Sequence, residues 1–302
     1  MPARFILSFD CEGKWGVADE LGPRQRRDLS DERLRGAYGS ILEILEEYDI
    51  PATFAFVGAF TQPPAAFARI RPAIENLCRR APAYLGPALH DIDETMGAGW
   101  HGHDCVRAVA QSRIAHEIAL HGVTHVPWTA IDADFAETEL QIFEKLEGPI
   151  LASRTFVYPR NLVAHTDILA RHGFEGFRTA KRARTRLSSF LSEFNLFEGP
   201  EVVLPRGEMV TIPAGFFLNW RSGLRRLVPE WLTRQRIKRL LEAAAPTDAV
   251  VHYWLHPENV ASAPLTLGNL RSLAREVAVA RDAGACETLT QIDYCRRVEQ
   301  LV

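Results

Sequence analysis

The sequence predicts an α/β protein built on a parallel sheet, and three observations support this prediction. Residues 5–9 form a short apolar run, residues 30–45 carry an apolar stripe at helical spacing, and residues 51–57 form a second apolar run. This strand–helix–strand order is the repeat of parallel sheets. Similar units continue along the chain, and polar residues follow several of the strands. The 302 residues, 47% of them hydrophobic, suffice for one large α/β domain or for two smaller ones.

The remaining elements follow from the same two periodicities. Further strands are expected where short apolar runs end in polar, Gly or Pro residues, at 118–120, 155–161, 175–178, 249–255 and 286–289. Helices are expected where apolar residues recur every three or four positions, at 66–80, 106–115, 131–147, 169–173, 267–283 and after 289. Residues 13–30 are polar with Gly and Pro, which predicts a loop, and residues 60–105 predict an irregular insertion.

Composition excludes several classes of protein. A net charge of −3 gives no global indication of nucleic-acid binding. The five cysteines show no C-x-x-C spacing, so a disulfide framework is not expected and a reducing compartment is. The first ten residues are too short an apolar run for a signal peptide, and no run of about 18 apolar residues is present to span a bilayer. We therefore expect a cytoplasmic protein of undetermined oligomeric state.

Two strongly basic segments lie at 178–186 and 221–239, within a region that spans about 178–240. In the second segment arginines alternate with Leu, Ile and Trp. A solvated charged helix face is one explanation. The other is a surface for anionic ligands or for peripheral contact with an anionic membrane.

Residues that can bind metals or transfer protons follow four of the expected strands. In a barrel of parallel strands the carboxyl ends meet at one rim, which is where such folds place their chemistry. We therefore expect these residues to share one site: Asp10, Glu12, His121, His125, Arg160, Asn161 and His256.

The pair His121 and His125 is the centre of the predicted site. Imidazole is a common ligand for Zn²⁺-like metals, although many H-x-x-x-H pairs are structural. With Glu12 the pair makes a set of two imidazoles and one carboxylate, which is a hydrolytic arrangement. Asp10 lies two residues before Glu12, so an extended chain points both side chains the same way and Asp10 becomes the candidate general base.

Two more residues complete the predicted chemistry. His256 is the candidate acid that protonates a leaving amine. Arg160 could orient the base carboxylate by charge-assisted hydrogen bonds. The inferred reaction is hydrolysis of an amide or ester through a tetrahedral oxyanion. The sequence contains neither the G-x-S-x-G pattern of serine hydrolases nor the G-x-G-x-x-G fingerprint of dinucleotide-binding proteins.

At five places the sequence resembles the polysaccharide deacetylases, the group with NodB homology that forms carbohydrate esterase family 4. Residues 8–13 (Ser-Phe-Asp-Cys-Glu-Gly) resemble its first motif, and residues 52–57 resemble its second-strand signature. His-Gly-Val-Thr-His at 121–125 is similar to its His-(Ser/Thr)-x-x-His motif. Residues 156–161 occupy the place of its Pro-containing motif, and Trp-Leu-His at 254–256 is similar to its last motif.

This resemblance covers about residues 4–290 and implies a distorted (β/α)7-type barrel, with residues 1–302 as a single catalytic domain. It implies that Asp10 is the base, that His256 is the acid, and that Glu12, His121 and His125 hold the metal. Glu12 stands where many members carry a second Asp. The implied metal is divalent, with Zn²⁺ as first choice and Co²⁺, Ni²⁺ or Mn²⁺ as alternatives. The expected substrate-binding residues are Trp15, Trp100, Tyr158, Asn161 and Trp220.

The implied activity is removal of an N-acetyl or N-formyl group from an amino sugar. With the expected cytoplasmic location, we expect a nucleotide-linked or lipid-linked sugar of surface-glycan synthesis. The basic segments would suit a phosphate-bearing substrate. Two alternatives remain: a metal-independent amidase of the same fold that acts on a non-sugar amide or ureide, and an inactive sugar-binding homologue.

Overall fold

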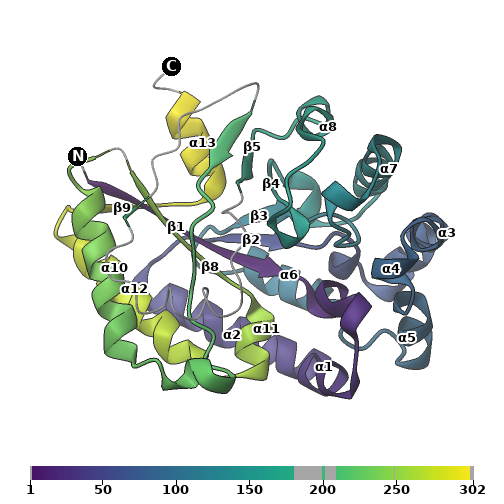
Figure 1. Cartoon of the computed structure of the whole chain (residues 1–302), viewed down its shortest axis with the longest axis horizontal. Helices are drawn as coiled ribbons and strands as arrows, with labels where there is room; N and C mark the ends of the chain where they lie inside the picture. The colour runs from purple at the N-terminus through teal and green to yellow at the C-terminus, as the bar shows by residue number, and fades with distance from the viewer. Residues whose placement is uncertain (1, 180–198, 201–208, 248, 300–302) are drawn as a thin grey trace.

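The computed structural model describes residues 2–179, 199–200, 209–247 and 249–299. Within these residues one parallel sheet has the strand order β6-β5-β4-β3-β2-β1-β8-β7, and β9 also pairs with β1 (Figure 1). The strands are β1 (Ala3–Cys11), β2 (Thr53–Phe56), β3 (Glu117–Leu120), β4 (Thr155–Val157), β5 (Gly176–Arg178), β6 (Val210–Ile212), β7 (Phe216–Phe217), β8 (Val250–Leu255) and β9 (Cys286–Leu289).

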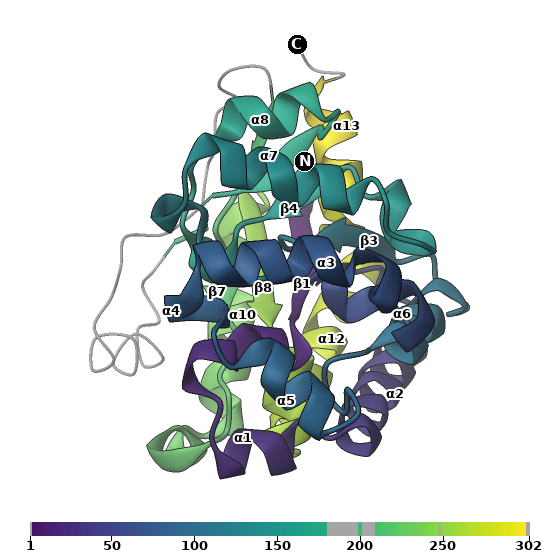
Figure 2. The same ribbon diagram turned by 90° about the vertical axis from the view of Figure 1, so that its right-hand side faces the viewer.

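Helices surround this sheet (Figures 1 and 2). Those of the first half are α1 (Pro23–Asp28), α2 (Asp31–Tyr48), α3 (Pro64–Arg80), α4 (Pro82–Leu85), α5 (Ala88–Glu94), α6 (His103–Ala110), α7 (Ala133–Phe143) and α8 (Thr166–Arg171). Those of the second half are α10 (Glu230–Ala244), α11 (Pro257–Ser262), α12 (Thr266–Asp282) and α13 (Gln291–Glu299). Short 3-10 helices include η1 (Gly13–Glu20), η5 (Pro159–Asn161) and η6 (Gly223–Leu227). None of the described helices is long and apolar enough to cross a membrane.

The central strand β1 is buried along almost its whole length, which agrees with its apolar sequence. It pairs in parallel with β2 on one side and with β8 on the other. In this register Phe9 is paired with Leu255, so His256 follows at the same level as Asp10. Phe56 of β2 is paired with Leu120 of β3, so His121 also begins at this edge. Strand pairing therefore brings the polar residues after β1, β3 and β8 together.

The sheet is strongly curled, and one contact demonstrates this. In the strand order β5 lies four positions from β1. Neighbouring strands are about 4.8 Å apart, so in a flat sheet the two would be roughly 19 Å apart, farther than an Arg side chain reaches. Arg178 at the end of β5 nevertheless donates two hydrogen bonds to Asp10 of β1. The predicted distorted α/β barrel is confirmed.

Local periodicity did not predict every element. The expected loop at 13–30 contains η1 and α1, and the expected irregular region contains α4 and α5. Long-range contacts hold these segments: the buried Lys14 Nζ lies 3.1 Å from Asp91 Oδ2, and Trp100 Nε1 donates to the same oxygen at 2.8 Å. The short strands β6 and β7 were not expected either. Most of the first basic segment, from residue 180 onward, lies outside the described residues.

Candidate active site

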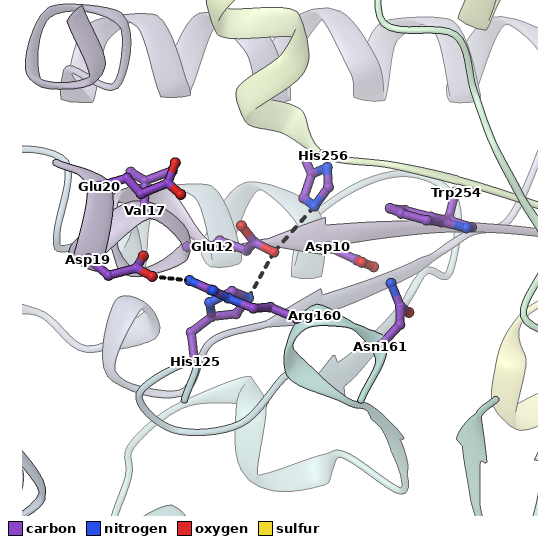
Figure 3. A pocket seen from close by; sticks show the side chains of 11 residues that line it. Asp10, Glu12, Val17, Asp19, Glu20, His125, Arg160, Asn161, Trp254 and His256 are labelled. Carbon is purple, nitrogen blue, oxygen red and sulfur yellow. Dashed lines mark hydrogen bonds and ion pairs between the residues drawn. The ribbon is translucent and has the colours of Figure 1, made fainter. Parts of the chain in front are cut away.

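Four predicted site residues meet around one carboxylate oxygen, and Figure 3 shows three of them, Glu12, His125 and His256. Glu12 Oε1 lies 3.1 Å from His121 Nε2, 3.1 Å from His125 Nε2 and 3.3 Å from His256 Nε2. These side chains come from the ends of β1, β3 and β8, and both His121 and His125 are buried. The structure therefore brings together the carboxylate and the imidazoles that the sequence analysis assigned to one site.

The ring of His121 is oriented by a backbone contact. Its Nδ1 lies 2.7 Å from the carbonyl oxygen of Val157 at the end of β4. A carbonyl only accepts, so Nδ1 carries a proton, and Nε2 is the ring nitrogen that faces Glu12 Oε1, 3.1 Å away. A hydrogen bond of this kind to the outer nitrogen is typical of histidines that bind metals.

The chemistry of the donor set fits a divalent cation. The Nε2 atom of His125 is buried and makes no hydrogen bond, although it lies beside Glu12. Ligand atoms about 2.1 Å from a tetrahedral Zn²⁺ are about 3.4 Å apart, close to the separations observed here. The ligand atoms of Glu12, His121 and His125 all lie within 4.8 Å of one another. An orphaned buried nitrogen facing two other donors is what a metal site requires.

Asp10 and Glu12 are in different environments. Both oxygens of Asp10 accept from the guanidinium of Arg178, at 2.7 and 2.5 Å, and both side chains are buried. Burial raises the pKa of Asp10, but the Arg178 charge outweighs it and holds the pKa below its usual value. Asp10, Glu12 and His256 form a second close group of potential ligands. Since Asp10 is engaged by Arg178, it suits the role of a base better than that of a ligand.

The charges of Glu12 and His256 depend on each other. Burial raises the pKa of Glu12, but the imidazoles of His125 and His256 lower it well below the usual range. Burial lowers the pKa of His256, but the adjacent Glu12 carboxylate raises it to about 10. Nδ1 of His256 lies 3.2 Å from Asn259 Oδ1, which fixes the ring. The raised pKa favours the imidazolium form of His256, which can donate a proton.

The loop that carries the two histidines is anchored by a buried carboxylate. Glu139 of α7 accepts from the backbone N–H of Thr124 at 2.9 Å and from Trp128 Nε1 at 2.9 Å. Gly122 and His125 have positive φ, of 70° and 63°, and these left-handed turns return the chain toward the site. Glu139 lies in the middle of a predicted helix, and its spacing along the chain does not indicate this role.

Asp10, Glu12, His125 and His256 line a cavity of about 330 Å³ (Figure 3). Its size is within the range of small-molecule sites. Trp254, which is half-buried, forms one wall, and the guanidinium of Arg178 lies 4.8 Å from its ring centre. The cavity is lined by Asp10, Glu12, Gly16, Val17, Asp19, Glu20, His125, Arg160, Asn161, Trp254 and His256.

A second, larger cavity of about 970 Å³ shares three of these lining residues, Val17, Glu20 and Trp254. Its lining includes the aromatic and basic side chains of Phe217, Trp220, Arg24 and Arg225 and the acidic side chains of Glu20, Asp28 and Glu258. The two cavities therefore form a continuous surface around Trp254.

Comparison with known structures places this geometry in a known fold. No protein-family model matches the sequence, and no curated protein does. A structure assigned to the polysaccharide deacetylases, from Mycobacterium smegmatis, has a TM-score of 0.61 and 17% identity, covering 99% of this chain and 90% of that chain. The chain has the polysaccharide deacetylase fold. A structure of Puue allantoinase, at 14% identity, has a TM-score of 0.53 and covers 97% of this chain and 90% of that chain.

Within this deacetylase fold, the predicted position of one residue requires correction. Arg160 does not contact Asp10: its guanidinium lies 2.5 Å from Asp19 at the rim of the cavity. Its backbone has a positive φ of 56° in η5, and its side chain lines the cavity on the side of Asp19. Arg178 binds Asp10 instead, and Asn161 Oδ1 accepts from Arg178 at 2.7 Å. Arg178 could have been found by the criterion used for the histidines, since it ends a predicted strand.

The predicted substrate-binding aromatics divide into two groups. Trp15, Trp100 and Tyr158 are fully buried in the core and cannot contact a ligand, so these three predictions are wrong. The two tryptophans pack edge-on at 5.0 Å between ring centres, which the sequence could not indicate. Trp220 lies in the larger cavity. Trp254, which the sequence analysis named only as part of the last motif, lines both cavities.

Glu258 is a second residue that the sequence analysis missed. Its Oε1 accepts from the backbone N–H groups of Glu12 and Gly13, at 3.0 and 2.5 Å. Burial is the largest cause that raises the pKa of Glu258, and the charge of Glu12 is the second. Together they raise this pKa to about 7. Glu258 thus fixes the backbone that carries Glu12.

Proposed function

We propose that this protein is a metal-dependent hydrolase that removes an N-acetyl or N-formyl group from an amino sugar. The observation that carries the proposal is the placement of the buried Asp10–Arg178 pair beside the cluster of Glu12 and three imidazoles. Asp10, Glu12, His125 and His256 line one cavity. A base, an acid and a metal-binding set lie together, as amide hydrolysis requires. The polysaccharide deacetylase fold supports the same reaction class.

Glu12, His121 and His125 are the proposed metal ligands. Zn²⁺ suits two imidazoles and one carboxylate, and Co²⁺, Ni²⁺ or Mn²⁺ could occupy the same donors. When bound, the cation would supply Lewis-acid polarisation of the acyl carbonyl.

The chain's own residues provide the proton transfers. Asp10 accepts a proton from the attacking water, and Arg178 keeps the carboxylate ionised and correctly oriented. His256 donates a proton to the leaving nitrogen as the C–N bond breaks. The products are a carboxylic acid and the free amino sugar.

The proposed substrate is a cytoplasmic amino sugar linked to a nucleotide or a lipid carrier, an intermediate of surface-glycan synthesis. The cavity of about 970 Å³ next to the Glu12 cluster gives room for a group larger than one sugar ring. Trp220 and Arg225 line this cavity and suit an aromatic or apolar group and a phosphate, respectively.

A metal-independent amidase that acts on a ureide is the second candidate, because the Puue allantoinase structure has the same fold. The two candidates differ in the role of Glu12. Metal analysis separates them: a protein purified without a divalent metal, and active in the presence of a chelator, would favour the ureide hydrolase. A metal content near one ion per chain, with activity lost on chelation and restored by Zn²⁺, would favour the deacylase.

The deciding experiment measures acetate and formate release from free, nucleotide-linked and lipid-linked N-acyl amino sugars. We expect release from at least one class, with loss of activity in the Asp10→Asn variant. A wild type that releases neither acid from any of these substrates, yet binds them, would support an inactive sugar-binding homologue instead.

Substitution of Gly16 by Ala should weaken metal binding. A Cβ at Gly16 would lie 1.8 Å from Glu12 Oε2, so the carboxylate must move away from the imidazoles. Displacing a ligand in this way is expected to lower Zn²⁺ affinity about 10- to 100-fold, the usual effect of disturbed ligand orientation. Titration calorimetry with Zn²⁺ measures this. Gly39→Ala on α2, where a Cβ would meet nothing within 4 Å, is the matched control and should bind Zn²⁺ normally.

A further inference from the structure

The segment around η6 and the start of α10 exposes an unusual number of large apolar side chains. Leu224 is 73% exposed, Leu227 69% and Trp231 61%. Leu265, 65% exposed, lies beside them, because the backbone N–H of Arg221 donates to the Thr266 side chain at 3.2 Å. These are four of the eight exposed large apolar residues among those the structure describes. Such a concentration is typical of a binding surface.

The same surface is basic. Of the charged residues in 221–242, Arg226, Arg234, Lys238 and Arg239 are exposed, against two exposed acids, Glu230 and Glu242, whereas the whole chain has a net charge of −3. Arg234 also lies 3.4 Å from Glu276. On α10 the exposed residues Trp231, Arg234 and Lys238 follow one another at spacings of three and four, so they share the outer face of the helix. Arg226 is exposed between the two leucines of η6. Exposed apolar and cationic side chains therefore alternate along η6 and the first turns of α10.

We propose that this face docks on an anionic lipid bilayer. The docking face consists of Leu224, Arg226, Leu227, Trp231, Arg234 and Lys238. Leu and Trp insert into the boundary between headgroups and acyl chains, while Arg and Lys bind the anionic headgroups. Charge complementarity favours this occupant, because an anionic bilayer satisfies both kinds of side chain at once. Nucleic acid would leave the exposed leucines without a partner.

The docking face adjoins the route to the candidate active site. Arg225 of η6 lines the larger cavity, and Trp254 lines both this cavity and the one around Glu12. A carrier lipid held in the bilayer could thus extend along this surface toward Glu12. This consequence rests on the proposed function, and it selects lipid-linked amino sugars over nucleotide-linked ones. The docking itself does not depend on catalysis.

The test is co-sedimentation of the full chain with vesicles of phosphatidylcholine, with and without phosphatidylglycerol. We expect binding only to the phosphatidylglycerol vesicles, weakened by salt. Each surface cation contributes about fivefold to such binding. Combining Arg226→Glu, Arg234→Glu and Lys238→Glu should therefore reduce vesicle affinity more than about tenfold, and combining Leu224→Ser, Leu227→Ser and Trp231→Ser should do the same.

Controls use exposed residues far from the docking face. Met96→Ser, at a position 93% exposed, and Arg79→Glu on α3 should bind vesicles like the wild type. The Asp10→Asn variant should also bind vesicles like the wild type. Vesicle binding can therefore be tested even if the proposed catalytic function is wrong. Circular dichroism checks that each variant is folded, and Trp231→Ser alone replaces the triple variant if that variant unfolds.

Two results would overturn the proposal. One is binding to neither kind of vesicle, or binding that the docking-face variants do not alter. The other is concentration-dependent self-association, seen by analytical ultracentrifugation and abolished by the apolar triple variant, which would make the face an interface between protein chains. Hydrolysis of a soluble N-acyl amino sugar, measured in parallel, should be unchanged in these variants.

Discussion

The Asp10→Asn variant is expected to lose about two to four orders of magnitude in kcat, the usual contribution of a general base. Asparagine has nearly the same shape as aspartate, but its amide cannot accept the proton from water. The loss should appear in kcat rather than in KM, because the substitution removes an interaction needed only in the transition state. Steady-state kinetics on the substrate found by the acid-release assay measure it.

Zn²⁺ binding separates this explanation from loss of the site. Since Glu12, His121 and His125 are untouched, the Asp10→Asn variant should bind Zn²⁺ with near wild-type affinity. A variant that hydrolyses the substrate at the wild-type rate would contradict the assignment of Asp10 as the base. A variant that neither binds Zn²⁺ nor hydrolyses would show that Asp10 acts as a ligand, in line with the second close group of Asp10, Glu12 and His256.

The Arg178→Met variant is expected to lose about 3–5 kcal/mol of stability, because removing one partner of a buried ion pair leaves the other charge uncompensated. Arg178 is completely buried, and Asp10 is 2% exposed. Methionine fills similar space without the charge. Denaturant unfolding at neutral pH measures the change. The combination of Asp10→Asn with Arg178→Met should recover part of the stability, since neither charge then remains buried.

The pH dependence of this variant gives a second readout. In the wild type Arg178 holds the pKa of Asp10 below its unfolded value, so the stabilisation is present above about pH 4 and is lost as the pH falls through the folded pKa. Without Arg178, burial raises the pKa of Asp10, and only the smaller effects of His121 and His256 oppose it. The sign then reverses: the variant loses stability as the pH rises through the new pKa. The acid limb of its kcat/KM profile should move to higher pH than in the wild type.

Arg160 provides the comparison for Arg178. It pairs with Asp19 at the rim, where its side chain is 38% exposed. We expect Arg160→Ala to change KM and to leave the acid limb of the pH profile in place, because it does not touch Asp10. An acid limb that moved in Arg160→Ala but not in Arg178→Met would restore the role that the sequence analysis gave to Arg160.

The sequence alone determined the α/β class, the order of most strands and helices, and the residues that gather around Glu12. His121 and His256 directly follow apolar strands, and parallel strands end at one edge whatever their order in the sheet. Local periodicity therefore sufficed to bring them together. The sequence also showed that basic and apolar residues alternate at 221–239. It did not show whether the leucines of this segment are exposed.

Only the tertiary structure decided which arginine reaches Asp10 and which aromatic side chains line the cavity. Arg178 lies four strands from Asp10, and only the curl of the sheet brings the two together. Trp15 and Trp100 are as suited to stacking on a sugar as Trp254, but they pack against each other in the core. Burial and long-range pairing depend on how distant segments pack in space, and a periodicity read over a few residues contains no information about that.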